Sequence, residues 1–229
     1  MINVTDISKS YGSLPAVCHA TFQINKGEIT GFLGPNGAGK STTLKMLAGV
    51  LAPDSGKVEI KGKDINTAPI ECKRHIGFLA EDNPLYGNMY VREYLEYAAR
   101  FYLPQKEIKE ATDKAIESCG LATEYKKKID NLSKGNRQRV GLAQAIIHHP
   151  EFLILDEPTT GLDPAQQEEM LRFISAYAPD THILFSTHTL QEVKSICSRV
   201  IIIHKGIIRI NETIDKNSAI EDLFFEHTR

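Results

Sequence analysis

The sequence of 229 residues lacks any apolar run that approaches the roughly 18 residues needed to cross a membrane as a helix. It also lacks an excess of positive charge, because its formal net charge is −2 at pH 7. Surfaces dedicated to nucleic acid usually carry a strong basic excess, so we expect no nucleic-acid partner. The lysine run at 126–128 is interpreted as a solvated loop.

Cysteine is scarce and scattered, at Cys18, Cys72, Cys119 and Cys197, with no C-x-x-C pair. This pattern excludes a disulfide framework and a zinc site and suits a reducing cytosol. The first six residues lack the basic-then-apolar plan of a signal peptide. Apolar residues make up 41% and charged residues 24%, as in ordinary globular proteins. We therefore expect a cytoplasmic protein, with residues 1–229 forming a single domain.

A glycine-rich loop separates an apolar, strand-like run from a helix-like run at residues 41–48. The loop reads Gly34-Pro35-Asn36-Gly37-Ala38-Gly39-Lys40-Ser41, which is G-x-x-x-x-G-K-[ST] in a strand–loop–helix context. Glycines allow positive φ angles, and the loop amides and the helix start then form a cradle for phosphate. The pattern predicts that Lys40 reaches the β- and γ-phosphates of a nucleoside triphosphate and that the Ser41 hydroxyl binds Mg²⁺. Thr42 is expected to place a second hydroxyl near the α- or β-phosphate.

Two carboxylates follow the apolar run 152–155, which is expected to be a strand buried on both faces. Neighbouring side chains on a strand point to opposite faces, so different roles are expected for them. Asp156 is predicted to hold Mg²⁺, and Glu157 to activate the attacking water as a general base. His188, at the end of the strand-like run 182–188, is predicted to contact the γ-phosphate and sense its presence.

Helical periodicity dominates residues 90–130. One stripe is predicted to pack into the core and contains Val91, Tyr94, Leu95, Ala98 and Phe101. A second helix spans about 108–119, with Gly120 as its C-cap. We expect residues 81–150 to form a helical subdomain inserted between two α/β halves.

The segment Leu132-Ser133-Lys134-Gly135-Asn136-Arg137-Gln138-Arg139 resembles the L-S-x-G-x-x-Q-R signature of the ATP-binding-cassette (ABC) ATPases. The phosphate loop, this signature, the two carboxylates, a D-loop containing Asp163 and the histidine occur in that family's order, over about residues 2–210. Tyr11 falls at the family's adenine-stacking position; by itself, a packed tyrosine at a turn is the alternative. The resemblance implies a P-loop NTPase core of the α/β class. A mainly parallel sheet is expected, with an N-terminal antiparallel β subdomain and a helical subdomain carrying the signature.

The resemblance also implies a mechanism. In this family two cassettes face each other head to tail, and each ATP lies between the phosphate loop of one and the signature of the other. The trans contacts would come from Leu132, Ser133, Lys134, Gly135 and Gln138. The implied partners are a second cassette, identical or paired, and an integral membrane permease. The implied function is an ATPase subunit of a membrane transporter, lying peripherally on the cytoplasmic face of the cell membrane.

One position departs from the family pattern. The family usually has glutamine after the strand at 76–79, where its amide contacts Mg²⁺ and the lytic water, and this sequence has Glu81. A carboxylate can still bind Mg²⁺, but it adds negative charge beside a triphosphate. Glu81 and the tail 218–225 resemble those of exporter-type cassettes, so export is expected.

Two alternative functions remain open. An ABC protein acting on ribosomes or nucleic acid usually joins two cassettes in one chain or inserts long coiled coils, and this sequence has neither. A small-molecule phosphotransferase is disfavoured because it would have no use for the signature or the D-loop.

Overall fold

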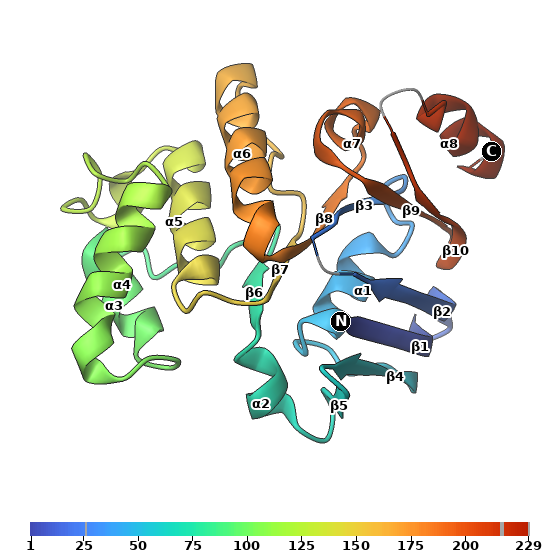
Figure 1. Ribbon diagram of the computed structural model, residues 1–229, viewed down its shortest axis with the longest axis horizontal. Helices are drawn as coiled ribbons and strands as arrows, with labels where there is room; N and C mark the ends of the chain where they lie inside the picture. The colour runs from blue at the N-terminus through green and yellow to red at the C-terminus, as the bar shows by residue number, and fades with distance from the viewer. Residues whose placement is uncertain (26, 216–217, 229) are drawn as a thin grey trace.

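A six-stranded sheet forms the centre of the computed structural model, which describes residues 1–25, 27–215 and 218–228 (Figure 1). Its strand order is β10-β9-β3-β8-β7-β6, and all its strands run parallel except β10. The strands are β3 (Ile29–Leu33), β6 (Ile76–Leu79), β7 (Phe152–Leu155), β8 (His182–Thr187), β9 (Arg199–His204) and β10 (Ile207–Thr213). Every residue of β3, β7 and β8 is buried, as expected for strands covered on both faces.

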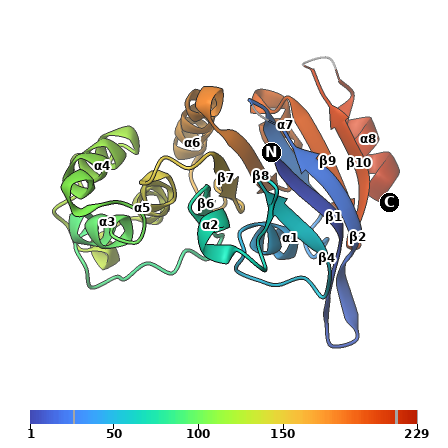
Figure 2. The same ribbon diagram turned by 60° about the horizontal axis from the view of Figure 1, so that its bottom comes forward.

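A second sheet, antiparallel and four-stranded, lies beside the first (Figure 2). Its order is β2-β1-β4-β5, and its strands are β1 (Ile2–Tyr11), β2 (Leu14–Ile24), β4 (Ser55–Ile60) and β5 (Lys63–Asp64). Alternating apolar residues of β1, such as Ile2 and Val4, point into a core that also holds α1 (Lys40–Leu47). The helix that follows the phosphate loop is therefore packed in the same core as the N-terminal sheet.

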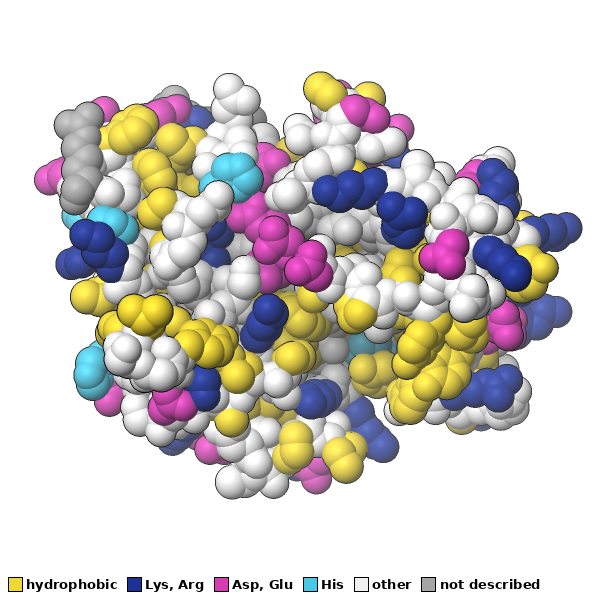
Figure 3. All heavy atoms as spheres, turned by 180° about the vertical axis from the view of Figure 1, so that it is seen from behind, with side chains coloured by type: hydrophobic (Ala, Val, Ile, Leu, Met, Phe, Trp, Pro, Cys, Tyr) yellow, Lys and Arg dark blue, Asp and Glu magenta, His cyan; other side chains and the backbone are white. Residues whose placement is uncertain are grey.

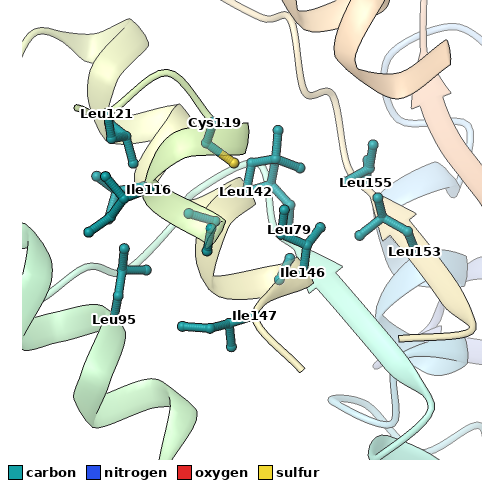
Figure 4. Packing of buried hydrophobic residues seen from close by; sticks show 14 of the residues in the cluster. Leu79, Leu95, Ile116, Cys119, Leu121, Leu142, Ile146, Ile147, Leu153 and Leu155 are labelled. Atoms are coloured by element: carbon teal, nitrogen blue, oxygen red, sulfur yellow. The ribbon is translucent and has the colours of Figure 1, made fainter. Parts of the chain in front are cut away.

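Alternation along the central strands divides the apolar residues between two large cores. Phe152 and Ile154 of β7 belong to the core shared with α1, whereas Leu153 and Leu155 belong to the core of the helical region. Figure 4 shows Leu153 and Leu155 facing Leu79 and the helices of that second core. The helices around the sheet are α2 (Pro69–Lys73), α6 (Pro164–Tyr177), α7 (Leu190–Ile196) and α8 (Ile220–Thr228), with a 3₁₀ turn η2 (Ala178–Asp180).

The chain between β6 and β7 is helical and lies at one end of the molecule (Figures 1 and 2). It contains α3 (Val91–Ala99), α4 (Gln105–Ser118), the 3₁₀ turn η1 (Ile129–Asn131) and α5 (Lys134–Ile146). Gly120, with φ 66°, follows the end of α4, where the sequence places a C-cap. None of the described helices is long and apolar enough to span a bilayer.

The predicted fold class is confirmed: a mainly parallel sheet, an N-terminal antiparallel sheet and a helical region containing the signature. The sequence also predicts a turn at residues 25–28 and a short helix over about 217–226. Residues 26 and 217 of these two segments lie outside the described ranges. The prediction for Phe101 is wrong. Helix α3 ends at Ala99, so position 101 leaves the helical stripe, and its side chain is 66% exposed.

This difference within one predicted stripe can be measured. Leu95→Ala should destabilise the protein by about 2–5 kcal/mol, because Leu95 is fully buried and the substitution leaves a cavity. Phe101→Ala should change stability by less than about 0.5 kcal/mol, as for other exposed positions. Urea unfolding of both variants measures the difference, and equal destabilisation would contradict the assigned burial.

Candidate functional site

The ends of four parallel strands meet at one edge of the central sheet. Leu33 pairs with Thr187, Leu155 with Phe185, and Leu79 with Leu155, so β3, β8, β7 and β6 end close to one level. In open parallel sheets this carboxyl edge is where ligands bind. A cavity of about 350 Å³ opens there, lined by Ala16, Asn36, Gly37, Gly39, Lys40, Ser41, Thr42, Glu81, Glu157, Thr160 and His188.

The glycine-rich loop is fixed by close contacts that exclude side chains. Gly39 has φ 105°, in the left-handed region, and a Cβ there would collide with the carbonyl oxygen of Ala16. Helix α1 begins at the next residue, Lys40, and its first turn contains no acidic residue. The Lys40 ammonium donates to the carbonyl oxygens of Gly34 at 2.8 Å and Pro35 at 3.3 Å. Its charge is thus held across the loop, beside the positive end of α1.

The turn of one hairpin is hydrogen-bonded to this loop, and a strand of a second hairpin is hydrogen-bonded to that turn. The amide of Gly206, in the turn between β9 and β10, donates to Ala38 at 2.9 Å. The carbonyl oxygen of Gly206 accepts from the amide of Cys18, on β2, at 2.8 Å. A chain of hydrogen bonds therefore links the phosphate loop to segments near both ends of the sequence.

Asp156 lies directly after β7 and is fully buried. Its Oδ1 accepts hydrogen bonds from Ser186 Oγ at 2.7 Å and Ser41 Oγ at 3.1 Å. Its Oδ2 is buried with no partner among the described residues. Burial raises the pKa of Asp156, and the two serine hydrogen bonds lower it only in part.

These oxygens fit Mg²⁺. Within the described ranges no group of three or more His, Cys, Asp and Glu side chains stands ready to hold a metal ion. Mg²⁺, however, is usually held by one or two protein oxygens together with substrate phosphates and waters. The free oxygen of Asp156, beside the Ser41 hydroxyl at the rim of the loop, supplies such a set.

Glu157 does not follow the predicted strand geometry. Strand β7 ends at Leu155, so alternation along a strand does not set the directions of the two carboxylates. Instead, Glu157 has φ 49°, an uncommon backbone conformation for a non-glycine residue, and its amide donates to Ser186 Oγ at 2.9 Å. Such strain tends to persist at functional sites, where the surrounding contacts enforce it.

The Glu157 carboxylate is buried and contacts three groups in the cavity wall. Lys40 Nζ lies 3.3 Å from Oε1, whereas Thr160 Oγ1 donates to Oε2 at 3.0 Å and His188 Nδ1 lies 2.9 Å from Oε2. Glu81 lines the same cavity. Burial and then the charges of Asp156 and Glu157 raise the pKa of Glu81. The cavity thus gathers the predicted lysine, carboxylates and histidine in one place.

The signature lies away from this cavity, because none of residues 132–138 lines it. Ser133 is exposed and caps α5, where its Oγ accepts from the amide of Asn136 at 3.2 Å. The other signature positions divide between exposed Lys134 and buried Leu132, Gly135 and Gln138. The Asp163 carboxylate accepts from the amide of Gln166 at 3.0 Å and caps α6. The side chain of Gln166 covers Gly135, since a Cβ there would lie 2.6 Å from its Oε1.

Tyr11 is also outside the cavity lining. It pairs with Leu14 at the tip of the β1–β2 hairpin and is 53% exposed, while Ala16 of the same hairpin reaches the cavity. Sequence reasoning did not assign roles to Ala16, Thr160 or Ser186. Only Ser186 had a local signal, as a polar residue at the end of a buried strand.

Comparison with known proteins decides the family, because the ABC transporter family model matches residues 17–160. The chain belongs to the ABC transporter family. It is 39% identical over 231 residues to the bacitracin transport ATP-binding protein BcrA of Bacillus licheniformis, covering 100% of this chain and 71% of that protein. It is 34% identical over 208 residues to the linearmycin resistance ATP-binding protein LnrL of Bacillus subtilis, covering 90% of this chain and 67% of that one.

Solved structures agree with this family. The ATP-binding subunit of an ABC transporter superposes with a TM-score of 0.89 at 28% identity, covering 100% of both chains. A dimeric ATP-binding cassette in a post-hydrolysis state, bound to ADP and Pi, gives 0.85 at 23% identity, covering 93% of this chain and 98% of that one, and shares the fold. The cassette described here is an ATPase whose hydrolysis of ATP is coupled to transmembrane transport.

Because Asp156 is buried, we expect its replacement to raise the stability of the cassette and to lower its ATPase activity. Asp156→Asn should abolish ATP hydrolysis but raise the stability of the nucleotide-free cassette by about 1 kcal/mol, or about 2–4 °C in Tm. An asparagine keeps an oxygen for Ser41 and Ser186 but buries no charge. Thermal unfolding and ATPase assays on the same preparation measure both effects.

The sign of the pH dependence follows from the raised pKa. The folded state of the wild type loses stability as pH rises from 3.8, the ordinary value for this carboxyl, through its raised pKa. The asparagine variant lacks that loss, so its stability advantage should grow across this window. Asp163→Asn is the matched control, because asparagine caps a helix as well as aspartate does. A lower Tm for Asp156→Asn would contradict the assigned burial cost.

Proposed function

We propose that this chain is the ATP-binding and ATP-hydrolysing subunit of a membrane exporter and that it works as one of two paired cassettes. The supporting observation is a divided site. One cavity gathers Lys40, Ser41 and Glu157, while the start of the signature helix at Ser133 is exposed outside it. Residues 1–229 then act as a single cassette, with residues 81–150 as its helical subdomain.

The phosphate loop would grip ATP by charge and by backbone amides. The amides of the loop from Gly34 to Ser41, together with the Thr42 hydroxyl, donate to phosphate oxygens. Lys40 exchanges its contact with Glu157 for the β- and γ-phosphates, which carry more negative charge. Tyr11, on the hairpin that reaches the cavity, offers an exposed ring to the adenine face.

Ser41 and Asp156 would hold Mg²⁺, which neutralises charge on the phosphates and polarises the transferred phosphoryl group. Glu81 would be a further oxygen at the same rim. Burial first, and then repulsion by Asp156 and Glu157, raises the pKa of Glu81, and a bound cation would relieve this repulsion.

Glu157 would take the proton of the attacking water. Once Lys40 turns to phosphate, the Glu157 carboxylate is held by Thr160 and faces His188. A carboxylate in this position accepts the proton as water attacks the γ-phosphorus. His188 would donate to a γ-phosphate oxygen while contacting Glu157, and so report whether that phosphate is present.

The second cassette would complete each site. Ser133 and the exposed start of α5 present amides and a positive helix end that match a γ-phosphate carried by another cassette. Leu132, Lys134, Gly135 and Gln138 would shape this surface, and Asp163 would lie at the interface in the D-loop. The dimeric cassette with the same fold supports such a pair. ATP would close the pair, and loss of the γ-phosphate contacts would release it.

A groove beside the helical region is proposed to receive the permease. Two neighbouring cavities of about 250 and 260 Å³ share Tyr102 and Gln144 in their walls. The exposed aromatic residues Tyr86, Tyr97 and Phe101 line the second cavity. Figure 3 shows hydrophobic side chains gathered over the end of the molecule that carries the helical region. Docking there would hold the cassette on the cytoplasmic face of the membrane, within reach of the loop carrying Glu81.

Outward transport is supported by the relatives' names and by Glu81. One relative is named for transport of bacitracin and another for linearmycin resistance. Removing a toxic compound from the cell is one way to resist it. The sequence departure at Glu81 resembles exporter-type cassettes.

Glu157→Gln tests the paired mechanism. The variant should bind ATP, hydrolyse it at least about 100-fold more slowly, and accumulate as a dimer, because the proton acceptor is lost but the phosphate contacts remain. Gel filtration with light scattering in the presence of Mg-ATP measures the dimer. Lys40→Ala is the control and should stay monomeric, since phosphate loses its main counter-ion. A monomeric Glu157→Gln protein with undiminished turnover would reject both the base and the pairing.

Partner capture separates the exporter from the alternative. Tagged chain isolated from its native cells should copurify with an integral membrane protein, identified by mass spectrometry, and not with ribosomes or nucleic acid. The double variant Tyr97→Ser, Phe101→Ala should lose that protein while the isolated cassette keeps its ATPase activity. Ile207→Ala, an exposed apolar residue of β10 outside the groove lining, should retain it. Recovery of ribosomes in place of a membrane protein would favour the alternative function.

A further inference from the structure

Glu192 is a buried carboxylate to which the roles above give no task. It lies on α7 and is 7% exposed. Across the described residues, its carboxylate accepts one hydrogen bond, from the hydroxyl of Thr187 at 2.5 Å. Burying an ionised side chain is unfavourable unless a specific contact compensates. The contact with Thr187 is therefore the feature to explain.

Thr187 links Glu192 to the segment around His188. It is the last residue of β8 and is 1% exposed. Its hydroxyl donates to Glu192 and at the same time accepts from the amide of Thr189 at 3.0 Å. A hydroxyl has one proton, so donating it to Glu192 leaves its lone pairs free for that amide. Thr187 and Thr189 flank His188 in the sequence, so the hydrogen bond between them spans the backbone of the histidine.

In the part of the chain that the structure describes, one polar contact holds the His188 side chain. Its side chain is 53% exposed, and its ring nitrogen Nδ1 lies 2.9 Å from Oε2 of Glu157. A half-exposed ring is held in place mainly by its backbone and by that one contact. Small changes in the backbone between Thr187 and Thr189 would move the ring away from the γ-phosphate position.

We propose that Glu192 is a positioning residue for His188, acting through the Thr187 hydroxyl and the Thr189 amide. The proposal rests on the proposed role of His188 in hydrolysis. A carboxylate has acceptors only, so either of its oxygens can accept the Thr187 proton. Glutamine can present its Oε1 in the same way, whereas alanine cannot, and this distinction defines the variants.

Steady-state kinetics provide the first test. Glu192→Ala should lower kcat about tenfold, which is about 1.4 kcal/mol of transition-state stabilisation, with KM for Mg-ATP within about twofold of wild type. Thr187→Val should do the same, whereas Glu192→Gln and Thr187→Ser should keep most of the activity. Glu221→Ala is the control. Glu221 lies on α8 and forms an ion pair with Lys194, which is on α7 like Glu192, but among the described residues no hydrogen bond joins it to Thr187.

Dependence on His188 provides the second test. In a His188→Ala background, Glu192→Ala should cause no further loss of kcat, because the group it positions is absent. An equal tenfold loss in both backgrounds would overturn the proposal. If Glu192→Ala shows no cooperative thermal unfolding, Thr187→Val replaces it in both backgrounds. Thr187→Ser, which keeps the hydroxyl, is then the conservative control.

Histidine-ring NMR separates this inference from the proposed role of His188. The His188 signals, assigned by their loss in His188→Ala, should shift in Glu192→Ala and return toward the wild-type position in Glu192→Gln. If His188→Ala keeps full turnover, the role of His188 in hydrolysis fails, while the shift still supports positioning. Unchanged His188 signals in Glu192→Ala would overturn the positioning itself.

Discussion

The site depends on an imbalance of buried charge. Lys40, Asp156 and Glu157 are all buried at the end of the parallel strands. The lysine is paired with Glu157, so Asp156 has two hydroxyl donors and, among the described residues, one oxygen without a partner. Burying a carboxylate without an opposite charge beside it opposes folding. In the proposed function, Mg²⁺ that arrives with the triphosphate completes this arrangement.

The sequence predicted the parts of the fold that are determined by residues close together in the chain. The apolar runs of β3, β7 and β8, the loop at Gly34 to Ser41 and the C-cap at Gly120 all depend on residues close together in the chain. The order of the motifs then predicted the family, which the comparisons confirmed. Domain boundaries and the roles of single site residues stay predictions.

The features that the sequence did not predict depend on contacts between distant segments. Ser186 binds both Asp156 Oδ1 and the amide of Glu157, about thirty positions away, and no local pattern predicts that pairing. The predicted alternation at Asp156 and Glu157 was wrong because β7 ends one residue earlier and the chain turns through a left-handed conformation. Phe101 left its predicted stripe for a similar reason, since α3 ends before reaching it. The periodicity of apolar residues does not determine the residue at which a helix or strand ends.

The hydrogen bonds from Gly206 to Ala38 and from Cys18 to Gly206 have a consequence for how small this cassette can be. The first joins the phosphate loop to the β9–β10 turn, and the second joins that turn to β2. A fragment trimmed to the strand, the loop and α1 would contain every residue of the motif and still lose its rigid backing. The backing of the phosphate loop therefore draws on residues from the N-terminal hairpin to the turn at Gly206.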